Sequence, residues 1–162
     1  MLIIGIDPGK SGGIAWQQTG PMFADATKFG DTESDIVNQL RYCMQSYDSW
    51  FAYIEKVGAT PQMGVTSAFS FGRSYGFLRG CLIGLGIPFE EVSPVKWQSE
   101  FGLRQGKKLA QGDTDKHNAI KGKAQQLFPH LQVTHAKAAA LLIAEYGART
   151  INKRQLQPLE SP

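Results

Sequence analysis

The sequence has little cysteine and no long apolar run. Its 162 residues include two cysteines, Cys43 and Cys81, with no CxxC pair and no cluster of cysteine and histidine. This usage is typical of reduced thiols in a cytosolic protein rather than of a disulfide framework. No apolar run approaches the about 20 residues that span a bilayer, and the opening MLIIGI lacks the basic leader of a signal peptide. We expect a cytoplasmic protein with no membrane partner.

The chain is also poor in charge, and neither sign dominates. Charged residues make up 19% of it, hydrophobic residues 42%, and the formal net charge is +3. Such a composition is typical of a globular protein and not of a disordered one. The mild positive charge permits an anionic partner such as nucleic acid without requiring one. The length suits a single domain, which we place at 1–150, with a C-terminal tail at 151–162.

Predicted strands and helices alternate along the chain. The short apolar run 2–6 is typical of a strand that is buried on both faces. The next two strands are separated by a turn around Gly20 and Pro21, which indicates an antiparallel meander. This order predicts an α/β fold with a mixed sheet. The predicted strands are 2–6, 12–17, 22–28, 50–54 and 87–92; the predicted helices start at Thr32 or Ser34, at 66 (to 85), at Ser93-Pro94, at 113 (to 127) and at 135 (to 149, stopping near Gly147).

Two carboxylates are predicted to meet at one edge of this sheet. Asp7 follows the first strand directly, and Glu55 follows the fourth. Two like charges at neighbouring strand ends raise each other's pKa unless cations bind between them. Mg²⁺ takes oxygen ligands, and two such ions about 4 Å apart align the attacking water and the leaving oxygen of a phosphodiester. The pattern indicates a metal site, although Asp7 before Pro-Gly also suits a turn and Glu55 also suits an ion pair with Lys56.

Four motifs in a fixed order carry a resemblance to a known family. They are IGIDPGKSGGIAW, YIEKV, FGRSYGFLRGCL followed by GIPFEEVSPVKWQ, and AKAAALLIAEYG. Over about residues 1–150 the chain resembles the RuvC-type Holliday junction resolvases, and most of all their compact phage-borne branch. The resemblance implies an RNase H-like mixed five-stranded sheet flanked by helices. It also implies a homodimer that cuts four-way or other branched DNA with two Mg²⁺ ions per site, with Mn²⁺ as a substitute and no nucleotide cofactor.

The resemblance assigns the site residues one by one. Asp7 is the first metal-binding carboxylate and Glu55 the second, and a further acid is expected on the last helix directly before the run ALLIA. That position holds Ala139, and Ala136 lies three residues earlier. Residues three and four apart share a helix face, so His135 points roughly the same way as both alanines. His135 is a candidate ligand or proton-transfer group, with a surface histidine as the alternative.

Alanine at position 139 removes a charge from a site that must offset two dications. Ala139 costs the helix nothing, because alanine is the best helix former. We therefore predict that the active parent protein has Glu or Asp at position 139 and that this chain is an inactivated variant. Ala136 is either a second such change or natural. A naturally inactive relative is the alternative.

The segment FSFGRSYGFLRG combines arginines with aromatic residues. In the resembled family this region lines the DNA groove and contributes to the dimer, and an aromatic side chain there can stack on a base of an opened junction. Phe69 is the first candidate for that role. The glycines at 72, 76 and 80 recur every four residues and also suit a tightly packed helix. The proposed DNA contacts of this segment are Phe69, Phe71, Arg73, Tyr75 and Arg79.

Basic residues gather in the second half of the chain, in one loop and the helix after it. A charged run is usually a solvated face, but this placement also suits a track for DNA phosphates. Lys116 is the best single candidate, because GDTDKHNAIKGKAQQLF resembles the stretch from which a family lysine reaches the phosphate at the active site. Asp113 and Asp115 suit a helix N-terminus. The candidate phosphate contacts are Lys96, Arg104, Lys107, Lys108, Lys116, Lys121 and Lys123.

Two alternatives from other classes remain open at this point. The first is a protein that binds junction DNA without cutting it, which the alanine at position 139 supports. The second is a fragment of an actin-like or sugar-kinase ATPase, because GIDPGKSGGIAW also suits a phosphate-binding hairpin. Those proteins have two such subdomains, and the sequence has no second glycine-rich DxG turn. Junction cleavage and ATP binding are the assays that separate these classes.

Overall fold

A mixed β-sheet forms the centre of the molecule. The computed structural model describes residues 1–162 except 10, 20–22, 46, 61, 105–112 and 157–162. Within this part the sheet has five strands in the order β3-β2-β1-β4-β5, which confirms the predicted α/β class and the mixed sheet. β1 pairs antiparallel with β2 and parallel with β4. The strands are β1 (Leu2–Asp7), β2 (Gly13–Gln18), β3 (Ala24–Lys28), β4 (Trp50–Glu55) and β5 (Phe89–Val92).

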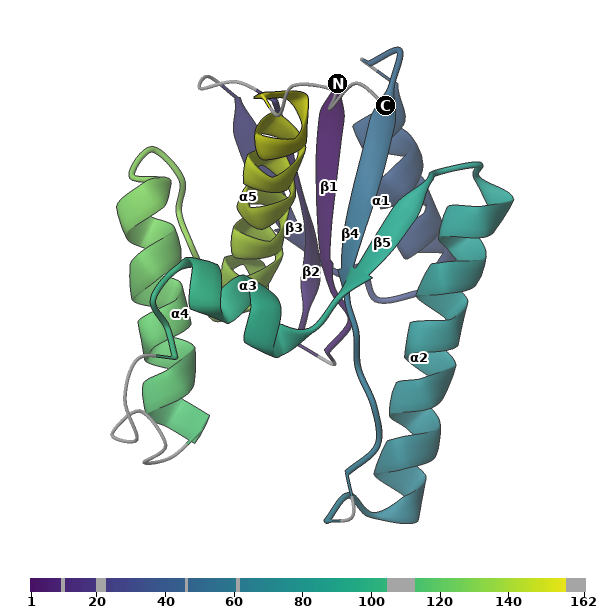
Figure 1. The fold of residues 1–162 in the computed structure, drawn as a ribbon. Coiled ribbons are helices and arrows are strands. Elements are labelled where there is room, and N and C mark those ends of the chain that lie inside the picture. Colours follow the sequence, from purple (N-terminus) through teal and green to yellow (C-terminus); the bar gives the residue numbers. More distant parts are fainter. Residues whose placement is uncertain (10, 20–22, 46, 61, 105–112, 157–162) are drawn as a thin grey trace, which may run out of the picture.

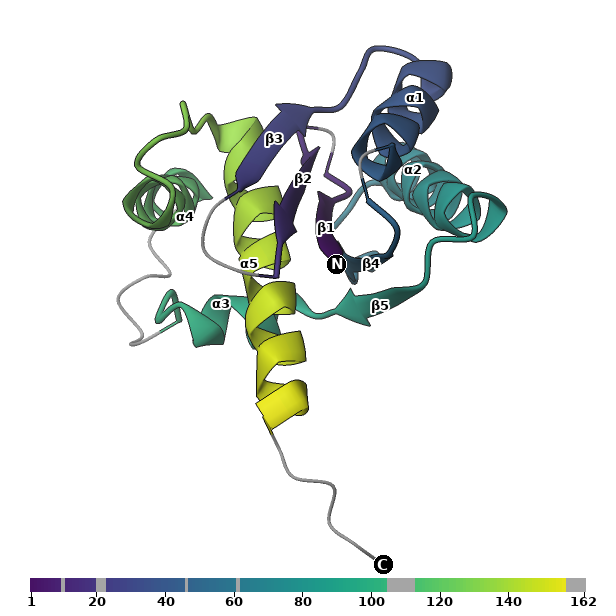
Figure 2. The ribbon, with the colours of Figure 1, turned by 90° about the horizontal axis from the view of Figure 1, so that it is seen from above.

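Helices cover both faces of the sheet (Figures 1 and 2). α3 (Pro94–Glu100), α4 (Asp113–Leu127) and α5 (His135–Leu156) lie on one side, and α1 (Glu33–Met44) and α2 (Val65–Gly84) on the other. The side chains of β1 alternate between two apolar cores: Ile3 packs on the α5 side and Ile4 on the α1 and α2 side. Both faces of β1 are therefore buried, as the continuous apolar run predicts.

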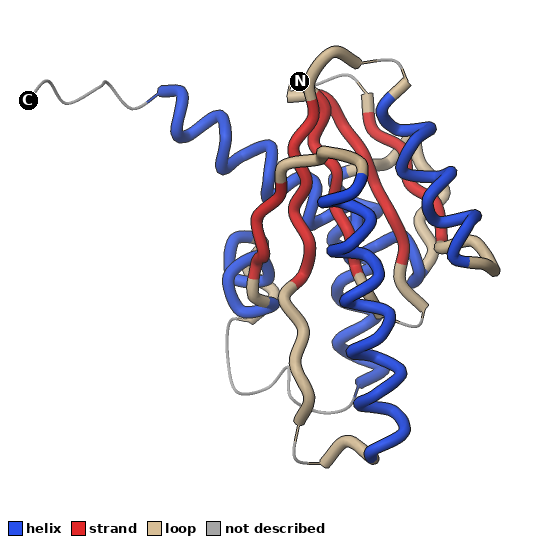
Figure 3. Tube along the Cα trace, turned by 90° about the vertical axis from the view of Figure 1, so that its right-hand side faces the viewer, coloured by secondary structure: helices blue, strands red, loops and turns tan. Residues whose placement is uncertain are grey.

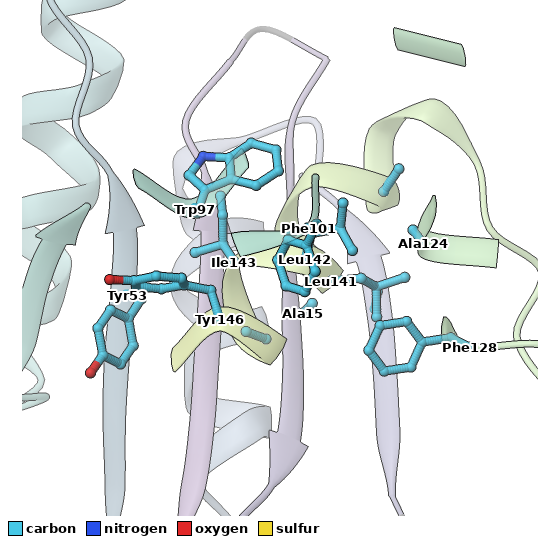
Figure 4. Packing of buried hydrophobic residues seen from close by; sticks show 14 of the residues in the cluster. Ala15, Tyr53, Trp97, Phe101, Ala124, Phe128, Leu141, Leu142, Ile143 and Tyr146 are labelled. Carbon is cyan, nitrogen blue, oxygen red and sulfur yellow. The ribbon is translucent and has the colours of Figure 1, made fainter. Parts of the chain in front are cut away.

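The core on the α5 side is built from aromatic and aliphatic side chains (Figure 4). Glycine lets α5 approach β1 closely, because a Cβ atom at Gly5 would collide with the backbone at Ala140 and Ala144. Tyr53 of β4 lies under α5, edge-on to Tyr146 with 5.9 Å between the ring centroids. This close packing holds the N-terminal end of α5 over the end of β1, where Asp7 lies.

The last helix continues past its predicted end. α5 runs to Leu156, so the prediction of an end near Gly147 or Arg149 is wrong, and residues 151–156 are helix rather than tail. Gly147 is not a helix stop, because it lies in the core against the ring of Tyr53, where a Cβ would collide. Beyond it, Lys153 and Arg154 pair with acids of α3 and β5. Residues 157–162 lie outside the described part.

Local signals account for most of the other boundaries. Thr32, and not Ser34, caps α1, in a capping box with Asp35, and Ser93 caps α3. β5 starts at Phe89, two residues later than predicted. The backbone N–H of Ile87 donates instead to the carbonyl of Leu82, which closes the end of α2.

Two helices reach beyond the sheet at the end where β1 and β4 terminate. α2 runs well past the strand ends, and α4 stands on the other side of the same edge (Figures 1 and 3). Among the helices that the structure describes, none combines the length and apolar character needed to cross a membrane.

Candidate functional site

Asp7 and Glu55 lie side by side at the carboxyl edge of the sheet. They end the neighbouring parallel strands β1 and β4, whose preceding residues Ile6 and Ile54 are register partners. Both carboxylates line one pocket of about 560 Å³. The predicted meeting of the two acids at one edge is therefore confirmed.

Burial governs the ionisation of both acids, and the charge of Asp7 adds to its effect on Glu55. Burial raises the pKa of Asp7. Two groups act in the opposite direction and lower this pKa: the backbone N–H of Gly9, which donates to Asp7 Oδ1 at 3.1 Å, and the nearby His117. Burial and then the charge of Asp7 raise the pKa of Glu55 to about 7. A hydrogen bond from Trp97 and the charge of Lys116 act in the opposite direction on Glu55. The site thus disfavours two bare negative charges and favours a cation between them.

Trp97 fixes the carboxyl group of Glu55. The indole Nε1–H donates to Glu55 Oε2 at 2.6 Å. Trp97 itself is 1% exposed and packs in the α5-side core, so its position is set by that packing. Trp97 follows the predicted helix start at Ser93-Pro94, but sequence reasoning did not connect it with Glu55. The sequence signal that could have found this contact is the capped helix start at Ser93-Pro94. The helix that begins there, α3, carries Trp97 to the end of β4, where Glu55 lies.

Basic and neutral groups from two helices complete the pocket. α4 contributes Lys116 and His117, and α5 contributes His135 and Ala139. Lys116 and His135, both predicted site residues, therefore line the same pocket as the two carboxylates. His117 is a site residue that sequence reasoning missed, and its only signal is its place directly after Lys116. Ala136 is not part of the lining of this pocket, and its carbonyl oxygen faces Gly13.

The donor set fits one hard dication better than two. Mg²⁺ is commonly held by one or two carboxylates together with water and substrate phosphate, and Asp7 with Glu55 supplies that set. In the part of the chain that the structure describes, no group of three or more His, Cys, Asp or Glu side chains is arranged to hold a metal ion. Ala139 faces the pocket with a methyl group where a second ion would need an oxygen ligand. The residues present do not support the predicted second ion.

Comparison with solved structures identifies the fold. Thermus thermophilus RuvC matches with a TM-score of 0.60 and 15% sequence identity, over 98% of this chain and 100% of that chain. One matching structure is of RuvC, and another is of RuvC in complex with a Holliday junction substrate. The fold is RuvC-like. No protein-family model and no curated protein matches the sequence.

The proposed DNA contacts on α2 of this RuvC-like fold divide into two groups. Phe69 is 74% exposed, and Phe71 and Arg73 line a second pocket beside the first. Tyr75 instead donates its hydroxyl proton to Glu91 Oε1 at 2.6 Å, and Arg79 Nε lies 3.1 Å from the same oxygen. Tyr75 and Arg79 thus attach α2 to β5, while Phe69, Phe71 and Arg73 have no such link to β5 among the described contacts.

The basic candidates are likewise spread over several environments. Lys96 lies 3.9 Å from Glu90, a loose surface pair, and Arg104 is exposed. Lys123 donates to Gln126 on the surface of α4. Lys107 and Lys108 fall outside the described residues. Among the predicted phosphate contacts, Lys116 alone combines a described position with a place in the carboxylate pocket.

Proposed function

We propose that this chain binds four-way or other branched DNA and that its site belongs to a metal-dependent phosphodiester hydrolase whose cleavage is weakened by alanine at position 139. The observation that carries the proposal is the pocket in which Asp7 and Glu55 meet at adjacent strand ends, facing Lys116 and His117. Paired carboxylates bind a divalent ion, and a lysine opposite them binds phosphate, so the pocket suits a phosphodiester.

The residues of the pocket have separate tasks in this proposal. A bound dication would neutralise the developing charge on the phosphate and acidify a water molecule. Asp7 and Glu55 hold that ion, and Trp97 keeps the Glu55 carboxyl group in one orientation. Lys116 binds a non-bridging oxygen of the scissile phosphate. His117 and His135 border the same space, where they bind phosphate oxygens or transfer protons.

Ala139 decides how much cleavage is expected. The residues present fit one ion, and in-line displacement with two ions needs a further oxygen ligand from α5. We propose that an acid at position 139 restores that ligand and that the protein with such an acid is the active resolvase. The present chain binds the junction better than it cuts it.

A homodimer follows from the symmetry of the substrate. A four-way junction with two opposed cuts calls for two sites related by a two-fold axis, which an isologous dimer provides. α2 is the candidate interface, because Gly72, Gly76 and Gly80 lie on its surface with open space where a Cβ would stand. A second chain can approach the helix backbone closely there.

The second candidate function is junction binding without cleavage. The absence of a third ligand from the described pocket favours it. Both functions predict DNA binding. They differ in whether an acid introduced at position 139 gives cleavage.

The test measures binding and cleavage of a mobile-arm four-way junction and of a linear duplex, with Mg²⁺ and then Mn²⁺. We expect the chain to bind the junction at least tenfold more tightly than the duplex and to cut it slowly. Ala139→Asp should accelerate cleavage at least a hundredfold, and Asp7→Asn added to it should abolish the gain. Tight junction binding with no cleavage by Ala139→Asp would support the non-catalytic function. Equal affinity for both DNAs would overturn both functions.

A further inference from the structure

A second pocket lies on the other side of the turn between β1 and β2. It has a volume of about 670 Å³ and is formed by the start of α1, one face of the projecting part of α2 and the turn itself. Its apolar lining includes Phe29, Ile36, Phe71 and Phe77. Neither the two carboxylates nor Lys116 belongs to it, so it is distinct from the carboxylate pocket.

The two pockets are neighbours with a shared wall. Gly9 lines both of them, and its backbone N–H donates to Asp7 Oδ1. The backbone N–H of Phe29 donates to the carbonyl of Gly12 at 3.3 Å, and Gly12 lines the carboxylate pocket. A ligand that fills both pockets therefore passes over Gly9.

Charged side chains stand at the rim of the second pocket. Asp31 and Glu33 precede and begin α1, and Arg73 faces them from α2; all three are exposed. Within the described part of the chain, none of the three takes part in an ion pair. Nearby hydroxyl groups on α2, such as that of Ser67, add further polar atoms. The pocket thus combines aromatic walls with exposed carboxylates.

This chemistry suits a nucleobase rather than a phosphate. Two carboxylates against one guanidinium repel a phosphodiester, for which the proposed place is the neighbouring carboxylate pocket. Carboxylates accept hydrogen bonds from amino groups of bases, and aromatic side chains stack on bases. Thymine has no amino group, so it is the base that we expect the carboxylates at the rim to bind least well.

We propose that the second pocket takes one unstacked base of the bound DNA strand, next to the phosphate in the carboxylate pocket, and selects bases that carry an amino group over thymine. Phe71 and Phe77 provide the stacking surface, and Asp31 and Glu33 accept from the amino group. The proposal rests on the proposed function, because the base enters only when the strand occupies the first pocket. It makes the second pocket the place where sequence preference arises.

The first experiment measures base preference in binding. Four-way junctions carry cytosine or thymine, with the matching partner base, at each of the three nucleotides on either side of the exchange point in turn. We expect the full chain to prefer cytosine at least fivefold at one position. Asp31→Asn, alone or with Glu33→Gln, should reduce that preference to less than twofold. The matched control is Asp48→Asn, an exposed acid in the loop before β4 at the opposite end of the sheet, which should leave the preference intact.

Three results distinguish the ways in which this proposal fails. Junction binding without any base preference, or with a preference that Asp31→Asn does not change, overturns the proposed base selection by the second pocket and leaves the proposed function standing. Equal binding of junction and duplex overturns the proposed function and the pocket with it. If Ser70→Trp, which fills the pocket from its exposed wall, changes the oligomeric state and not the base preference, a second copy of the chain is the occupant and the proposal is wrong.

A crosslink locates the base directly. A junction with 5-iodocytosine at the preferred position is irradiated in complex with the full chain, and the attached peptide is identified by mass spectrometry. Attachment at Phe71 or Phe77 supports the proposal. Attachment only at Phe69, which lies outside the pocket and is exposed, overturns it in favour of stacking on the surface of α2.

Discussion

Trp97 and Glu55 are joined by a hydrogen bond of 2.6 Å between the indole Nε1–H and the carboxylate Oε2, across 42 residues of sequence. The indole ring is buried in the core, and the carboxyl group faces the pocket. The bond therefore links the packing of α3 to the orientation of a carboxylate in the pocket. Among the described contacts of the site, this hydrogen bond connects the Glu55 carboxylate to the interior of the fold.

Replacing this indole should change the acidity of Glu55. Trp97→Phe removes a donor that lowers the pKa of Glu55, so that pKa should rise further above about 7. Divalent-ion affinity near neutral pH should fall accordingly. Carboxyl-carbon NMR titration of the chain measures the pKa. Trp16→Phe is the control, since Trp16 is a buried tryptophan of the opposite core; a matching pKa change in that variant would show a general effect of lost packing.

Stability without divalent ions should fall as the pH rises. The folded pKa of Glu55 is about 7 and its ordinary value 4.5, so the folded protein binds the proton more tightly than the unfolded chain. The resulting stabilisation is present below about pH 4.5 and is lost as the pH rises through about 7. Glu55→Gln should raise the free energy of unfolding at pH 8 by on the order of 2 kcal/mol. Urea denaturation at pH 5 and pH 8 measures this, and Glu33→Gln on the surface of α1 should show no such gain.

Divalent ions should stabilise the chain through a single site. Mg²⁺ bound between Asp7 and Glu55 favours the folded state by mass action, and the effect should grow from pH 6 to pH 8 as the carboxyl groups ionise. Calorimetric titration with Mn²⁺ should give one ion per chain, and Ala139→Asp should tighten binding or add a second ion. Asp7→Asn should abolish the shift in the melting temperature, whereas Asp48→Asn should keep it. Two ions bound by the unaltered chain would contradict the fit described above.

Two glycines should respond to alanine in opposite ways. Gly5→Ala places a Cβ against the backbone of α5 at Ala140 and Ala144, so the helix must move away from β1. The cost should exceed about 2 kcal/mol. Gly122→Ala in the interior of α4 meets open space and should stabilise the chain by about 0.5–1 kcal/mol. Chemical denaturation checks both, and a tolerated Gly5→Ala would mean that α5 is not held on β1 as described.

The order of elements and the two main carboxylates were predictable because their signals are local. The apolar runs before Asp7 and Glu55 are strands whose pattern is short and continuous, and parallel neighbours end at the same edge. Thr32 and Ser93 mark helix starts through their own side chains. Each of these inferences needs only residues a few positions apart.

Other parts of the site depend on contacts between distant segments. His117 enters the pocket because α4 packs against α5, and nothing in the spacing of its neighbours records that packing. Gly147 has the composition of a helix stop but lies against Tyr53, so the helix continues. The second pocket forms where α1, α2 and the β1–β2 turn converge, from segments that are separate in sequence.

The sequence by itself determined that an acid stands at the end of each of two buried strands and that the last helix offers alanine at position 139, because hydrophobic periodicity and residue identity are properties of short segments. The tertiary structure decided which groups surround those acids. Trp97, Lys116 and His117 reach them only through the packing of α3 and α4 against the rest of the fold. Burial then raises the pKa of both carboxyl groups, and the charge of Asp7 raises the pKa of Glu55 further, so that a cation between the two acids is favoured.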